Sequence, residues 1–161
     1  MRTSIRFLAA LTCAALFSGC ASNVAQRDAE RLALYRNHAG DPVDSIVYLG
    51  SYNGWTPLGD GAFALWTRPS QAYLVELFAP CSELDFADTI GFRNHGGRLS
   101  AKFDQVYVSN RGLLPISCTI REIRPLDVKA IRLAEKDARA KRQVEEAPAA
   151  PGSSGGPSSG T

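Results

Sequence analysis

Short runs of apolar residues fill the middle of the chain, and each run is rich in β-branched or aromatic residues. The segments between them carry Gly, Pro, Asn and Asp, which favour tight turns. Runs this closely spaced favour antiparallel pairing, because a parallel crossover needs about a dozen connecting residues. The pattern predicts seven strands, at residues 45–50, 54–58, 62–67, 72–78, 89–93, 105–109 and 116–123.

Helical periodicity flanks the strand region on its N-terminal side. Residues 28–39 are predicted to form a helix with Asp28 as its N-cap and Gly40 as its stop. Its apolar contacts are expected from Leu32, Leu34 and Tyr35. Within the strand region, residues 82–87 are expected to form one helical turn.

A second helix is predicted at residues 127–143, entered through Pro125 with Asp127 as its N-cap. One side of it is apolar, with Val128, Ile131, Ala134 and Ala138. Another side is basic, with Lys129, Arg132, Lys136 and Arg139. A basic stripe could face phospholipid head groups or another anionic polymer. Two acidic residues lie among these bases, which favours an ordinary solvated helix face.

Together these elements define the expected fold class: α+β, mainly β, with an antiparallel sheet or partly closed small barrel of six to seven strands and flanking N- and C-terminal helices. Residues 28–143 are expected to form a single globular domain, since this length is usual for one hydrophobic core. Residues 144–161 form an Ala/Pro/Gly/Ser tail with nothing to bury, so the tail is expected to be disordered.

The N-terminus has the layout of a secretory signal peptide. Residues 1–6 form a basic segment with two Arg and no acid. Residues 7–17 are apolar apart from Thr12, and small residues precede Cys20. A helix that crosses a bilayer needs about 20 apolar residues, so the run is too short to favour a membrane span. Residues 1–19 are therefore expected to be a signal peptide that is removed on export.

The segment at residues 16–20, which reads LFSGC, resembles the bacterial lipobox, although Phe17 stands where that pattern prefers Leu. The resemblance implies that the Cys20 thiol is acylated, and residues 20–27 are then a lipidated Cys and a short tether. Several acyl chains hold a protein on a membrane, because each buried CH₂ contributes about 0.8 kcal/mol. Ala and Ser rather than Asp after the cysteine imply the outer membrane. Ordinary cleavage, with Cys20 left as a free thiol, is the alternative.

Two cysteines remain in the mature domain, because Cys13 leaves with the signal peptide. In an oxidising compartment, the pair of Cys81 and Cys118 is expected to form a disulfide. A catalytic thiol or a metal-binding pair is the competing interpretation. Both would need nearby partners, and the whole chain has only two His residues.

Charge gives no sign of a nucleic-acid partner. Of the 18 basic residues, two lie in the signal peptide, so the mature chain has as many bases as its 16 acids. A nucleic-acid-binding domain would be strongly basic. The chain also lacks the G-x-S-x-G elbow, the phosphate-binding loop, H-E-x-x-H and the dinucleotide fingerprint, so we expect no enzyme activity, cofactor or metal.

Three residues nevertheless carry chemistry that catalysis could use. Asp85 and Asp88 could act as an acid pair on one helical face. A structural interpretation is favoured, in which Ser82 caps the short helix and the two acids interact with its dipole. His95 lies in a Gly-rich turn and is interpreted as a loop residue.

Aromatic residues cluster in and around the first hairpins, at Tyr48, Tyr52, Trp55, Phe63, Trp66 and Tyr73. Core filling is the favoured role for Phe63 and Trp66. Tyr52 and Trp55 flank a turn, so they could instead stack on a sugar or anchor a protein partner.

Several motifs of the chain occur together: Cys81-x-x-Leu84-x-Phe86-Ala87-x-x-Ile90, Cys118-x-Ile120-x-x-Ile123-Arg124-Pro125-Leu126-Asp127, Trp55-x-x-Leu58 and Ala64-Leu65-Trp66-Thr67. With these motifs, the region between Glu30 and Arg139 resembles a family of small proteobacterial lipoproteins classed as a domain of unknown function. The resemblance implies a lipidated envelope protein and implies no catalytic or binding residues.

The leading hypothesis is a non-enzymatic interaction or structural module, attached by its acyl anchor to the periplasmic face of the outer membrane, with an envelope protein or glycan as partner. The second is a small-ligand or glycan-binding module that uses Tyr52 and Trp55. The third is an enzyme that uses Asp85, Asp88 or His95.

Overall fold

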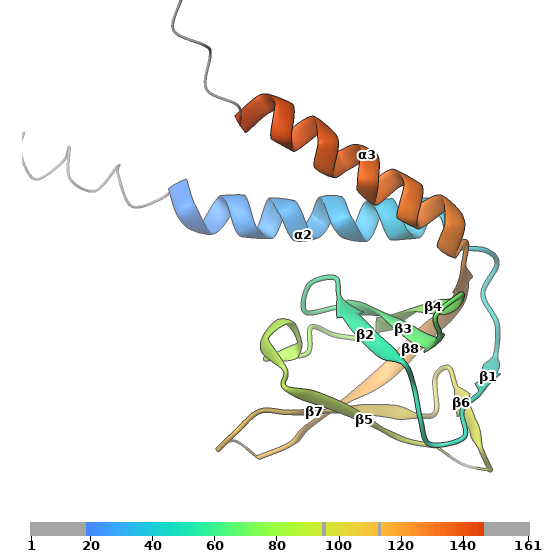
Figure 1. The fold of residues 1–161 in the computed structure, drawn as a ribbon. Coiled ribbons are helices and arrows are strands. Elements are labelled where there is room, and N and C mark those ends of the chain that lie inside the picture. Colours follow the sequence, from blue (N-terminus) through green and yellow to red (C-terminus); the bar gives the residue numbers. More distant parts are fainter. Residues whose placement is uncertain (1–18, 95, 113, 147–161) are drawn as a thin grey trace, which may run out of the picture.

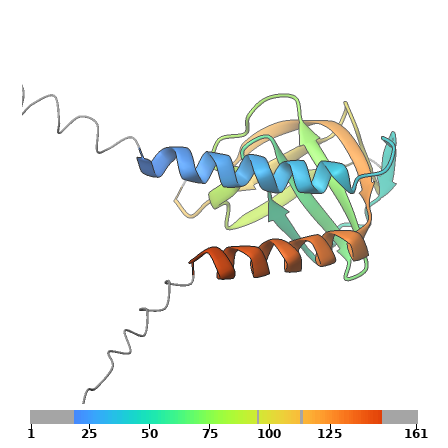
Figure 2. The same cartoon turned by 90° about the horizontal axis from the view of Figure 1, so that it is seen from above.

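The computed structural model describes residues 19–94, 96–112 and 114–146. Two long helices cover one side of a curled sheet (Figure 1), and they run side by side when viewed from above (Figure 2). The elements follow in the order α2 (Gly19–Asn37), β1 (Ser45–Val47), β2 (Gly54–Pro57), β3 (Ala62–Arg68), β4 (Gln71–Leu77), η1 (Leu84–Phe86), β5 (Thr89–Arg93), β6 (Arg98–Ser100), β7 (Gln105–Ser109), β8 (Ile116–Leu126) and α3 (Val128–Glu146).

The main sheet has six strands in the order β2-β3-β4-β8-β7-β5, and every neighbouring pair is antiparallel. Strand β8 joins its two parts, because β8 pairs with β7 near its start and with β4 near its end. The sheet curls into a half-barrel, and β1 and β6 form a separate two-stranded sheet. The arrangement confirms the predicted mainly-β α+β fold.

Alternation along β3 and β4 gives the sheet two apolar faces. Phe63, Leu65, Val75 and Leu77 point into the half-barrel, where they join the larger core. The intervening residues Ala62, Ala64 and Leu74 point to the other face and pack with Tyr35 of α2 and Ile131 of α3. Successive side chains of a strand point to opposite faces, so these two strands contribute to both cores.

The observed strand boundaries agree best with the predicted ones where turn residues lie on both sides of an apolar run. β5 and β7 have the predicted limits. β6 was not expected, because its three residues contain only one fully buried side chain, Leu99. β8 continues beyond the predicted end at residue 123 and includes Pro125, whose carbonyl accepts a hydrogen bond from Gly40.

The N-terminal helix begins earlier than predicted. It runs from Gly19, so the expected polar tether at residues 23–27 is helical and Asp28 lies inside the helix rather than at its N-cap. The segment after Gly19 contains no Gly or Pro and includes Ala, Gln and Arg, which favour helix. Cys20 is consequently the second residue of α2.

Helix α3 begins as predicted, with Asp127 as its cap. The Asp127 carboxylate accepts hydrogen bonds of 3.0 Å from the backbone N–H groups of Lys129 and Ala130. Val128 and Ile131 are buried against the sheet. The cap therefore sets the direction of α3 at the point where β8 ends.

Glu76 is a buried carboxylate on the helix-covered face of β4, 4% exposed. Arg36 of α2 donates a hydrogen bond of 2.7 Å to one of its oxygens, and Arg121 of β8 donates one of 3.0 Å to the other. Burial raises the pKa of the Glu76 carboxyl, but the hydrogen bonds and charges of the two guanidinium groups outweigh burial and hold the pKa below its usual range. The ionised carboxylate thus ties α2 to the sheet.

The predicted disulfide between Cys81 and Cys118 is present, with Cα atoms 5.9 Å apart. It joins the segment before η1 to β8 and closes a loop between two cysteines that are 37 positions apart in sequence. On the chain-entropy model, a loop of this length stabilises the fold by about 4 kcal/mol.

Replacement of Glu76 by Gln should lower the free energy of unfolding by about 1–3 kcal/mol at pH 7, because two guanidinium groups lose their counter-ion. Since the folded-state pKa is lowered, the stabilisation is complete above the unfolded Glu pKa of about 4.3 and is lost as pH falls through the folded pKa. Urea unfolding between pH 7 and pH 2 measures the difference between the proteins.

Glu122→Gln is the matched control, because Glu122 pairs with Arg124 at 3.4 Å from a partly exposed position. It should change stability by less than about 1 kcal/mol. A difference between the wild type and Glu76→Gln that stays constant with pH would contradict the assigned role of the ionised carboxylate.

Candidate functional site

Tyr52 and Trp55 are both partly buried and pack against the larger core. The Tyr52 hydroxyl donates a hydrogen bond of 2.8 Å to the carbonyl oxygen of Ile90 on β5. The Trp55 ring meets Phe63 edge-on, with centroids 6.4 Å apart. The two side chains therefore have structural contacts, and they do not form an exposed platform for stacking.

Phe92 of β5 also packs with the aromatic residues of the first hairpins, and the sequence pattern did not place it among them. Its ring centroid lies 5.1 Å from that of Tyr48, 6.0 Å from that of Tyr52 and 6.1 Å from that of Phe63. These rings belong to the larger core or pack against it, and they join the edge strand β5 to β3 and to the segment that leads into β2. Phe92 is far from the first hairpins in sequence, and only its alternation with Ile90 within a strand could have indicated the contact.

Asp85 and Asp88 do not form an acid pair in one site. Asp85 accepts a hydrogen bond of 3.1 Å from the Gly59 backbone N–H, whereas Asp88 accepts one of 3.1 Å from the N–H of Arg111. Burial, with Asp28 and Asp60 nearby, raises the pKa of the Asp85 carboxyl. Each acid holds a different loop.

The capping interpretation of this segment is also corrected. Glu83, not Ser82, occupies the N-cap position of η1, and it has a left-handed backbone with φ of 69° and no side-chain capping bond. A left-handed cap cannot present its side chain to the first turn in the usual way, because N-caps normally have an extended backbone. His95 lies outside the described residues, as do residues 1–18 and 147–161.

The predicted basic stripe of α3 is divided in the structure. Arg132 donates a hydrogen bond of 2.5 Å to the carbonyl of Pro69, and its guanidinium carbon lies 6.0 Å from the centroid of Trp66. Arg132 therefore fastens α3 to the β3–β4 turn. Lys129, Lys136 and Arg139 are exposed.

A groove lies between α2 and α3, lined by residues 27–35 of α2 and residues 135–142 of α3. The two helices run side by side in Figure 2. Its volume is about 340 Å³, and Leu34, Tyr35 and Ala138 form its less polar part. The Tyr35 hydroxyl donates a hydrogen bond of 2.8 Å to Glu135, which links the two helices. Burial, and then the Glu135 carboxylate, raise the pKa of Tyr35, so the hydroxyl stays protonated as a donor.

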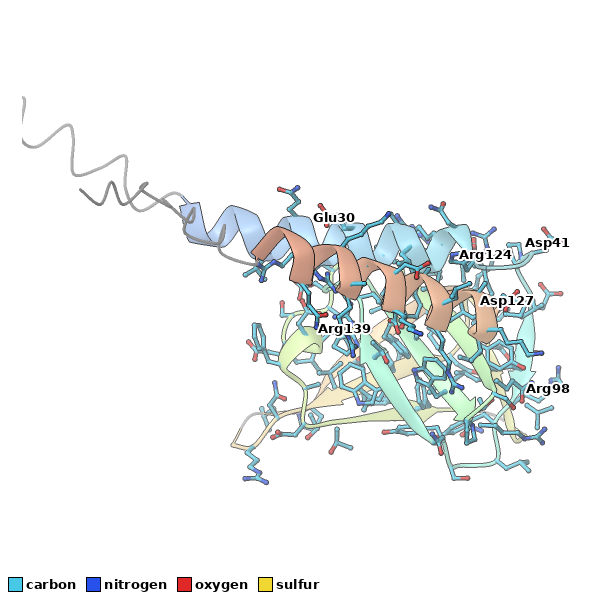
Figure 3. All side chains as sticks on the ribbon, turned by 45° about the horizontal axis from the view of Figure 1, so that its top comes forward. Glu30, Asp41, Arg98, Arg124, Asp127 and Arg139 are labelled. Carbon is cyan, nitrogen blue, oxygen red and sulfur yellow. A yellow bond between two sulfur atoms is a disulfide. The ribbon has the colours of Figure 1, made fainter. Side chains whose placement is uncertain are left out.

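Four arginines line this groove, two from each helix: Arg27, Arg31, Arg139 and Arg142. All four are exposed, and among the described side chains none has a carboxylate within ion-pairing distance. Figure 3 shows Glu30 on α2 and Arg139 on α3, each in the middle part of its helix. The sequence pattern indicated Arg139, but not that the arginines of α2 would lie opposite it.

The two acidic side chains of the groove accept hydrogen bonds from neutral donors. Glu30 accepts a hydrogen bond of 3.0 Å from the amide of Gln26, and Glu135 accepts the bond from Tyr35. Four guanidinium groups face two carboxylates, which leaves the groove basic. Its chemistry is therefore that of an anion site rather than a cation site.

Within the described ranges, no group of three or more His, Cys, Asp or Glu side chains is arranged to hold a metal ion. The helices in that part of the chain include none with the length and apolarity needed to span a membrane.

These features define a mainly-β α+β domain with a basic groove between its two helices. The chain belongs to a family of unknown function (DUF6491), which it matches over residues 1–142. The match confirms the resemblance to an uncharacterised family, while the lipoprotein part of that resemblance stays a prediction. Neither the curated proteins nor the solved structures include a match to this chain.

Replacement of Tyr52 by Phe should lower the free energy of unfolding by about 0.5–1.5 kcal/mol, because the Ile90 carbonyl loses its donor. Tyr73→Phe is the control, since among the described residues the Tyr73 hydroxyl accepts its hydrogen bond from the exposed Gln71 side chain. That variant should change stability by less than about 0.5 kcal/mol. Urea unfolding compares the two, and equal effects would contradict a structural role for the Tyr52 hydroxyl.

Proposed function

We propose that this protein is a lipid-anchored, non-enzymatic interaction or structural module of the bacterial cell envelope, attached through Cys20 to the periplasmic face of the outer membrane. The observation that carries the proposal is the sequence before Cys20: a basic start, an apolar run and small residues, as in an export leader with a lipobox.

The position of Cys20 in the fold determines how an anchor at this residue would be joined to the domain. Cys20 is the second residue of α2, and α2 continues without a break to Asn37. The far end of α2 is held to the sheet through Arg36 and Glu76. An acyl chain on Cys20 would therefore be joined to the β domain by a helix instead of a flexible linker.

The residues considered for catalysis support a non-enzymatic role. Asp85 and Asp88 bond to the backbones of two different loops, so they do not form the acid pair considered for catalysis. Asp85 lies instead near the carboxylates of Asp28 and Asp60. The partly buried positions of Tyr52 and Trp55 likewise favour the interaction module over the glycan-binding alternative.

Cys20→Ser should abolish acylation of the protein in cells, because serine has no thiol to receive diacylglycerol. Metabolic labelling with an alkyne fatty acid, followed by intact mass of the purified protein, measures the modification. The control Cys13→Ser should be labelled and processed as the wild type is, since Cys13 belongs to the removed leader. Labelling of Cys20→Ser equal to that of the wild type would refute the anchor.

In-cell chemical crosslinking tests the interaction part of the proposal. The acylated wild type should capture the same envelope protein in repeated experiments, and Cys20→Ser should lose it, because the partner is met only at the membrane. Mass spectrometry after affinity capture identifies the product. Capture of the chain alone, with no recurrent partner, would count against an interaction module.

A further inference from the structure

The groove between α2 and α3 has a charge arrangement that the proposed function does not use. We propose that this groove binds a phosphate group, supplied by anionic phospholipid head groups of the membrane that carries the acyl anchor. That the ligand is a phosphate group is argued from the residues of the groove. That the phosphate belongs to a membrane lipid rests on the proposed anchor at Cys20.

Repulsion within each helix is the first argument. Arg27 and Arg31 are four residues apart on α2, and Arg139 and Arg142 are three apart on α3. Residues at these spacings are neighbours on a helix surface, and like charges there destabilise the helix by a few tenths of a kcal/mol per pair. Both pairs face one groove, so a bound anion would relieve repulsion in two helices at once.

The kind of side chain is the second argument. All four bases are arginines, although lysine would serve equally well for a solvated helix face. A guanidinium group presents a planar fork of donors that matches two oxygens of a phosphate, which an ammonium group cannot do. A volume of about 340 Å³ is within the range of small-ligand sites.

The distance from the anchor is the third argument. Arg27 lies seven positions after Cys20, which corresponds to about 10 Å along a helix axis. The polar head-group layer of a leaflet is about 5–8 Å thick. An α2 helix inclined toward the membrane plane therefore brings the Arg27 side of the groove toward this layer, together with Arg139 and Arg142 of α3, which line the same groove.

The test uses the acylated, full mature protein reconstituted in phosphatidylcholine nanodiscs, with and without phosphatidylglycerol. Backbone hydrogen–deuterium exchange over residues 24–36 and 132–142 is the readout. Phosphatidylglycerol should slow exchange in both segments, and raised salt should weaken the effect. The phosphate of phosphatidylcholine is screened by its own ammonium group, so these discs give the reference.

Arg31→Gln combined with Arg139→Gln should abolish the added protection, because each helix loses one phosphate donor. Arg68→Gln combined with Lys129→Gln is the matched control: it removes the same charge from exposed positions outside the groove, and it should keep the protection. If both double variants lost the added protection equally, the protection would depend on net charge alone, and this result would contradict a phosphate site in the groove.

Inorganic phosphate added to phosphatidylcholine discs separates the two sources of the group. Protection by lipid and not by free phosphate at millimolar concentration supports the head-group assignment, whereas protection by free phosphate alone overturns it. Acylation and co-elution with the discs are checked first by mass and gel filtration. If they fail, the proposed anchor is wrong; if they hold and phosphatidylglycerol protects neither helix, only this inference is wrong.

Discussion

The buried carboxylate of Glu76 is the interaction on which the arrangement of helices and sheet depends. It lies on β4, and its two arginine partners come from α2 and β8. A carboxylate taken out of water is tolerated only when it is paired and hydrogen-bonded, and here each oxygen has its own guanidinium group. With α2 held on the sheet in this way, Tyr35 can reach Glu135, and the groove between the helices has a defined shape.

Much of the sheet was predictable, because its strands depend on local chemistry. Alternation along Ala62–Arg68 and Gln71–Leu77 and turn residues around Thr89–Arg93 indicate strands directly. The capping role of Asp127 was equally local. The short strand Arg98–Ser100 was missed, because its pairing with β1 depends on a tertiary contact and not on a pattern of its own.

The features that matter for a site were less predictable, since each joins segments far apart in sequence. Tyr52 was predicted as a possible binding residue, but its neighbours Ile90 and Phe92 come from the opposite edge of the sheet. The groove likewise needs two helices that lie side by side in the fold but are separated in sequence by all the strands of the sheet. Arg27 and Arg31 look like ordinary surface residues of α2 until α3 is placed beside them.

If the chain is exported as proposed, the disulfide has a consequence for the compartment in which the domain folds. The loop that it closes, between Cys81 and Cys118, contains η1, β5, β6 and β7, and so one whole end of the half-barrel. In a reducing cytoplasm this end lacks about 4 kcal/mol of stabilisation, a large share of the margin of a small domain. On the proposed export route, the precursor would be least able to complete its fold in the compartment where an unfolded chain is needed for passage through a translocation channel. On that route, oxidation after passage would make the fold persistent, so the cross-link that stabilises the domain would also determine when it folds.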